Sequence, residues 1–152
     1  MLQVELINPF LNATRDVFHT MLSCELSRGQ LERKQGYTPE YEVSGLIGLS
    51  GQCQGMVVLS LGRLTAMHAA AIMLGHQPDQ LNEDVVDAVG ELTNMIAGAA
   101  KAQLTEFDLS VSLPSVICGK HHSIKFPTGS TPIVLPFHSA IGSISVEVGL
   151  AV

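Results

Sequence analysis

One long segment with two unlike sides, EDVVDAVGELTNMIAGAAKAQL, places the strongest constraint on the fold of this chain, and it begins after Asn82. At about 100° per residue on a helix, one side of the segment collects apolar residues that must face a sheet. These residues are Val85, Val89, Leu92, Ile96, Ala99 and Ala100. The other side collects Asp87, Glu91, Asn94 and Lys101, with Gly90 and Gly98. The sequence therefore predicts a long helix with one buried and one exposed side.

The two glycines on the exposed side need a reason, because a glycine inside a helix costs about 1 kcal/mol relative to alanine. Gly90 and Gly98 make this side of the helix low, and we expect Ala97 and Ala102 to flank the same surface. The backbone of another protein could then lie close to the helix. The pattern favours a docking surface.

Two further helices and a hairpin are expected before this segment. Asn8 followed by Pro9 predicts a helix that starts there and runs to about residue 26, because asparagine caps free amide donors and proline fits the first turn. Glycine-punctuated apolar runs over residues 41–61 predict a hairpin with its turn at Ser50 and Gly51. The next helix is expected to end before Gly75, as a glycine commonly ends a helix. Its expected range is 63–74.

Strand-like segments follow the long helix, over residues 107–119, 123–127, 132–137 and 140–152. In the last of them, serine and glutamate alternate with isoleucine and valine, which predicts outward serine and glutamate side chains. This segment has no proline or lysine to blunt an edge, so we expect it to be paired, either inside the sheet or with a second copy of the chain. The order of elements predicts an α/β (α+β) fold, a single domain over residues 1–152 whose β-sheet is covered by helices on one side.

Composition excludes several classes of function. The 152 residues carry 8 Lys and Arg against 14 Asp and Glu, a formal charge of -6, so nucleic acid is not an expected partner. No apolar run approaches the roughly 20 residues that a bilayer span requires. The three cysteines are far apart, with no CxxC spacing and no N-terminal targeting signal, which favours a cytoplasmic protein with reduced thiols and a buried Cys118.

No metal site is expected in this chain. His121 and His122 are adjacent, and adjacent residues on a strand point to opposite faces. No third ligand lies nearby in the sequence, whereas a zinc site takes at least three protein ligands.

The spacing of Glu91 and Asn94 allows two interpretations. At i and i+3 on a helix their side chains emerge side by side, as residues of one site would. They could equally be solvated surface residues, with Glu83, Asp84 and Asp87 complementing the positive end of the helix.

The wider sequence of the long helix resembles the signature helix of the CheC/CheX/FliY family of chemotaxis phosphatases. The family pattern is Asp or Ser, three residues, Glu, two residues, Asn, and it is met here by Asp87, Glu91 and Asn94. The resemblance extends to INPFLNATRDVF, to LGH after the second helix and to PIVLPFHSAIGSISVEV. It is closest to the CheX branch, because the chain is short and has one such motif, with no ExxN in its first helix.

The resemblance implies a hydrolase that removes the aspartyl phosphate of a CheY-type response regulator. An amide cannot act as a base near neutral pH, so Asn94 would orient the attacking water, and Glu91 would pair with the lysine of the regulator. The phosphoryl group and its Mg2+ belong to the regulator, so the chain needs no cofactor of its own. Gly90, Gly98 and Lys101, with Asp87, would bind the partner, and the family resemblance implies a homodimer.

Two other functions remain open from the sequence. The same helical side could belong to a non-catalytic adaptor that docks a response regulator or a flagellar-motor-like component. An enzyme that acts on small metabolites with Glu91 as its base is a third hypothesis, which the open character of the motif side disfavours.

Overall fold

The structure, a computed structural model, describes residues 3–151 of the chain and consists of a mixed arrangement of helices and strands. The helices are α1 (Gln3–Leu22), α2 (Arg63–Leu74), α3 (Glu83–Gln103) and the short 3-10 helix η1 (Thr105–Phe107). The strands are β1 (Ser27–Arg28), β2 (Glu32–Arg33), β3 (Val43–Ser50), β4 (Gln54–Leu61), β5 (Ser110–Val111), β6 (Ser115–Cys118), β7 (Ile133–Ser139) and β8 (Gly142–Ala151).

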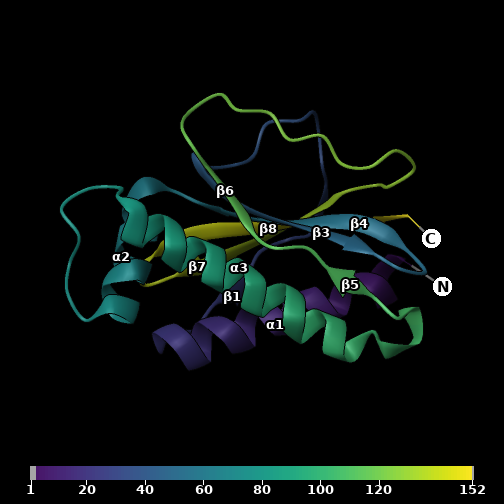
Figure 1. Cartoon of the computed structure of the whole chain (residues 1–152), viewed down its shortest axis with the longest axis horizontal. Coiled ribbons are helices and arrows are strands. Elements are labelled where there is room, and N and C mark those ends of the chain that lie inside the picture. Colours follow the sequence, from purple (N-terminus) through teal and green to yellow (C-terminus); the bar gives the residue numbers. More distant parts are fainter. Residues whose placement is uncertain (1–2, 152) are drawn as a thin grey trace.

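All strands belong to one antiparallel sheet, in the order β1, β7, β8, β4, β3, β5, with β2 also pairing with β7 and β6 also pairing with β3. Helices α1, α2 and α3 lie on one side of this sheet, and two long loops cross its other side (Figure 1). The predicted fold class, a β-sheet covered by helices with one long motif-bearing helix, is confirmed.

Local signals placed several elements correctly. Helix α2 spans Arg63–Leu74 and ends at Gly75, whose φ of 81° is left-handed. Helix α3 begins after Asn82, whose side chain accepts a hydrogen bond from the amide of Val85 at 3.1 Å. Strands β3 and β4 form the expected hairpin, and Gly51 in its turn has a φ of 120°.

The first helix differs from the prediction at both ends. Pro9 lies inside α1 and does not start it, and the helix ends at Leu22, before Ser23 with its φ of 50°. Proline costs the helix the bond that its missing amide would make one turn earlier, and its ring crowds the carbonyl at that position. The apolar residues on both sides of it are buried in the core, so tertiary packing outweighs that loss. They are Leu6, Ile7, Phe10 and Leu11.

The C-terminal strand β8 lies in the middle of the sheet, paired with β7 on one side and β4 on the other. The expected pairing of this segment is therefore made inside the sheet, and over residues 144–148 both sides of β8 are paired. The prediction of outward side chains was wrong, because Ser145 and Glu147 are both buried, at 1% exposure. The loops on the second side of the sheet cover them.

The predicted strand over residues 123–127 is absent, and this segment belongs to one of the covering loops. Its apolar side chains Ile124 and Phe126 pack against Val58 of β4 in a small second core. The amide of Ile124 also donates a hydrogen bond to the carbonyl of Tyr37 at 2.8 Å, which joins the two covering loops to one another.

A buried ion pair fastens the covering loop between β2 and β3 to the sheet. Lys34 Nζ lies 2.9 Å from Glu147 Oε2, with side-chain exposures of 8% and 1%, and Lys34 also donates to the carbonyl of Thr38. Burial raises the pKa of the Glu147 carboxyl, and the nearby Glu40 raises it further, whereas Lys34 opposes the shift. The folded protein therefore keeps a proton on Glu147 at pH values where the unfolded chain has released it.

This linkage predicts how Lys34→Met affects stability. Stability falls as pH rises from the ordinary carboxyl value through the raised pKa of Glu147, and loss of Lys34 extends that fall to higher pH. We expect Lys34→Met to lower the free energy of unfolding by about 3 kcal/mol at pH 8 and by clearly less at pH 5, measured by urea unfolding. The exposed Lys125→Met serves as the matched control. A loss that is equal at both pH values would contradict the assigned role of Glu147.

Candidate functional site

Helix α3 sits unusually close to strand β3 at one point. A Cβ atom added to Gly45 of β3 would lie 2.0 Å from Thr93 Oγ1, and Thr93 is itself buried at 1% exposure. Its hydroxyl donates to the carbonyl of Val89 at 2.7 Å, so it needs no other partner. The glycine in the strand thus lets the helix approach and fixes which side of α3 faces the sheet.

Glu91 and Asn94, on either side of Thr93 along the helix, are consequently exposed. Among residues 3–151, neither side chain has a hydrogen-bond or ion-pair partner within the chain. A carboxylate and an amide one helical turn apart are therefore free to engage a second molecule. Asp87, Gly98 and Lys101 lie exposed on the same helix, as the sequence predicted.

Gly90 and Ala97 are corrections to the predicted exposed side, since both are buried. A Cβ atom at Gly90 would lie 3.5 Å from Val116 Cγ2 and 3.8 Å from Pro114 Cγ, so this glycine packs against the segment around β6. The helix has three environments, the sheet, the segment formed by β5 and β6, and solvent. The sequence pattern separates an apolar side from a polar side, and it does not reveal that β5 and β6 cover part of the polar side. Gly98, by contrast, has open space where its side chain would be.

A groove runs beside the exposed side of α3. Its lining combines Asn94, Gly98 and Lys101 of the helix with the chain that follows, and its volume is about 780 Å³. The remaining lining residues are Ala102, Leu104, Thr105, Asp108, Leu109, Ser110 and Val111. The contribution of Ser110 and Val111 to the groove has no local signal in the sequence, because their position follows from the pairing of β5 with β3.

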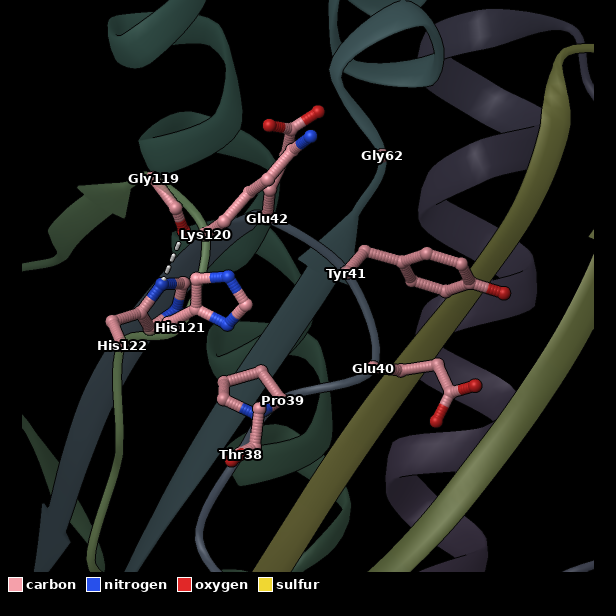
Figure 2. Close-up of a pocket in the computed structure, with 10 residues that line it drawn as sticks. All are labelled: Thr38, Pro39, Glu40, Tyr41, Glu42, Gly62, Gly119, Lys120, His121 and His122. Atoms are coloured by element: carbon pink, nitrogen blue, oxygen red, sulfur yellow. Dashed lines mark hydrogen bonds between the residues drawn. The ribbon is translucent and has the colours of Figure 1, made fainter.

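A second, smaller pocket lies away from the motif and contains the two adjacent histidines (Figure 2). His122 donates from Nδ1 to the carbonyl of Gly119 at 2.7 Å, and its Nε2 lies 2.8 Å from Ser44 Oγ, so both ring nitrogens serve to fasten the loop. Figure 2 also shows that the side chain of Glu40 points away from the histidines. Within residues 3–151 no group of three or more His, Cys, Asp or Glu could hold a metal ion.

Cys118 at the end of β6 is exposed, which corrects the expectation that it is buried. The strand lies at the edge of the sheet, paired only with β3, so its last side chain is left uncovered. Partial burial and the nearby Glu42 nevertheless raise the pKa of this thiol.

No helix in the described part of the chain is long and apolar enough to cross a membrane.

The model of the family described as chemotaxis phosphatase CheX matches residues 43–138, which is more than half of the chain and includes β3, β4, α2 and all of α3. The chain belongs to the CheX family. This confirms the family resemblance and its CheX branch, and it places the exposed Glu91 and Asn94 within the region that the family shares.

Individual relatives agree with this assignment. The CheY-P phosphatase CheX of Thermotoga maritima is 24% identical over 127 residues, which cover 82% of each chain. The chemotaxis protein CheX of Vibrio vulnificus is 38% identical, with a TM-score of 0.88 and coverage of 96% of this chain and 99% of that one. CheX in the CheX-CheY-BeF3-Mg+2 complex of Borrelia burgdorferi is 26% identical, with a TM-score of 0.83 and coverage of 97% and 98%.

Two glycine substitutions at this site are expected to have opposite effects on stability. Gly98→Ala should raise the free energy of unfolding by about 1 kcal/mol, because the site is helical and open. Gly45→Ala should lower it by about 1 to 3 kcal/mol, because its Cβ would collide with Thr93. Urea unfolding of both variants measures the two changes. Stabilisation by Gly45→Ala would contradict the close approach of α3 to β3.

Proposed function

We propose that this chain hydrolyses the aspartyl phosphate of a CheY-type response regulator, and that the exposed side of α3 performs the reaction. The observation that carries the proposal is the pair Glu91 and Asn94, exposed and unpartnered on the long helix of a CheX-family chain. Support also comes from the Thermotoga maritima relative, a CheY-P phosphatase, and from the Borrelia burgdorferi complex of CheX with CheY.

In this mechanism Asn94 contributes by position. Its amide neither gains nor loses a proton near neutral pH, but it can hold a water molecule in line with the phosphorus atom through its hydrogen bonds. Phosphoryl transfer needs little covalent help from a protein, so correct placement of the attacking water supplies much of the acceleration. The open groove beside Asn94 leaves room for the partner to bring its phosphoryl group there.

Glu91 acts as the anchor in the same proposal. Within residues 3–151 its carboxylate has no ion-pair partner, so a lysine of the regulator can pair with it and set the register of docking. Asp87 and Lys101, about 21 Å apart along the helix, would extend this contact with opposite charges at its two ends. Gly98 keeps the surface low between them. Gly90 packs α3 against β6, so it is buried and contributes no docking surface.

The phosphoryl group and Mg2+ are assigned to the regulator, and the chain is proposed to need no cofactor of its own. The complex of Borrelia burgdorferi, which contains CheY, BeF3 and Mg2+, is consistent with this division. A homodimer, a cytoplasmic location and a single domain over residues 1–152 remain predictions. The homodimer now rests on the family resemblance alone, because β8 is paired on both sides within the sheet.

Asn94→Ala tests the proposed role of the amide. Loss of the group that orients water should lower the rate of accelerated dephosphorylation about 100-fold or more, while affinity for the activated regulator changes little. Phosphate release and titration with a beryllofluoride-activated regulator measure the two quantities. Asn12→Ala, at an exposed position of α1, is the matched control.

Wild-type hydrolysis by Asn94→Ala would refute the mechanism. Tight binding by the unmodified protein without any phosphate release would instead favour the adaptor function.

Glu91→Lys tests the anchor. Placing like charges together should weaken binding to the regulator about tenfold or more, and Glu91→Gln should weaken it less. The affinity of the unmodified protein should also decline as salt rises. Isothermal titration at two salt concentrations provides the measurement, with Glu32→Lys on exposed β2 as the control. An unchanged dissociation constant for Glu91→Lys would remove the anchoring role.

A further inference from the structure

Leu113 is the most exposed large apolar residue of the described chain, at 89%. It lies in the short connection between β5 and β6. A leucine that is this exposed contributes no packing to the core, so replacing it should not lower the stability of the fold. Its side chain is therefore available to a partner.

The position of Leu113 along α3 follows from contacts on either side of it. Val111 shares the groove with Asn94 and Gly98, whereas Pro114 lies beside Gly90. Gly90 and Gly98 are about 12 Å apart on the helix, and the three residue steps from Val111 to Pro114 cover about 10 Å in an extended chain. The segment thus runs antiparallel to α3, and Leu113 lies alongside the stretch of the helix between Gly98 and Gly90, which includes Asn94.

The backbone that carries Leu113 is fixed. The amide of Ser112 donates to the carbonyl of Gly48 at 2.9 Å, and the amide of Gly48 donates to Ser112 Oγ, also at 2.9 Å. The Ser112 hydroxyl in turn donates to the carbonyl of Leu113 at 3.0 Å. Ser112 contacts Gly48 of β3 and Pro114 lies beside Gly90 of α3, whereas the side chain of Leu113 between them is 89% exposed and points outward. Little ordering entropy remains to be lost on binding.

We propose that Leu113 is an apolar anchor for the phosphorylated response regulator, seated beside Asn94, and that it determines affinity and not the rate of the chemical step. This inference rests on the proposed function. The anchor is continuous with the face that carries Glu91 and Asn94 and with the groove lined by Val111. The exposed side of α3 carries the acidic Asp87 and Glu91, so the complementary partner surface has an apolar recess with cationic groups on the same face.

The test uses a regulator that the unmodified protein is shown to dephosphorylate. Leu113→Ser should raise its KM, and the dissociation constant for the same regulator activated by beryllofluoride and Mg2+, about tenfold or more, because a buried leucine contact is lost. Its kcat at saturation should stay within about twofold, since Asn94 is untouched. Leu113→Met should keep most of the affinity. Thermal unfolding should match that of the unmodified protein.

Leu64→Ser is the matched control, because Leu64 is 68% exposed but lies on α2. An unchanged dissociation constant for Leu113→Ser, or an equal loss for Leu64→Ser, would overturn the inference. Asn94→Ala separates this outcome from failure of the proposed function. If Asn94→Ala is inactive while Leu113→Ser binds normally, only the anchor is wrong. If Asn94→Ala hydrolyses normally, the role assigned to Asn94 is wrong. If no regulator is dephosphorylated, the function itself is wrong.

Discussion

The contact between Gly45 and Thr93 fixes the geometry on which the candidate site depends. Because strand β3 has no side chain at this point, α3 can lie directly on the sheet, with the Thr93 hydroxyl bonded to its own helix. Because Leu92 and Thr93 both face inward, Glu91 and Asn94 lie on the opposite side of the helix and face outward. The exposure of Glu91 and Asn94 is thus a consequence of packing at a neighbouring residue.

The sheet itself is stable only with both sides covered. Strand β8 lies in its middle and carries Ser145 and Glu147 toward the side without helices, where the covering loops exclude water. Lys34 supplies the charge that an enclosed carboxylate needs, at some cost in desolvation. One of these loops continues directly from β6, so the cover of the second side and the segment beside α3 belong to one stretch of chain.

The resulting surface is suited to a reaction whose substrate is another protein. It offers an exposed carboxylate, an exposed amide and an open groove. A catalyst that only orients water and docks a partner needs little more, provided that the partner brings its own metal and phosphoryl group. Leu113 adds exposed apolar surface on the connection between β5 and β6, next to this helix.

The sequence by itself determined the features that depend on neighbouring residues. The bounds of α2, the cap of α3 at Asn82, the hairpin of β3 and β4 and the one-turn spacing of Glu91 and Asn94 all follow from local capping, turn and periodicity rules.

Tertiary structure alone decided the environments that distant segments create. Pro9 is helical because the residues around it are buried in the core, and Glu147 is buried because β8 is central. Gly90 is covered and Leu113 lies next to the helix because β5 and β6 return beside α3. A helical pattern separates an apolar side from a polar one, but it contains no information about which later strand will cover part of the polar side. That choice depends on the order of strands in the sheet.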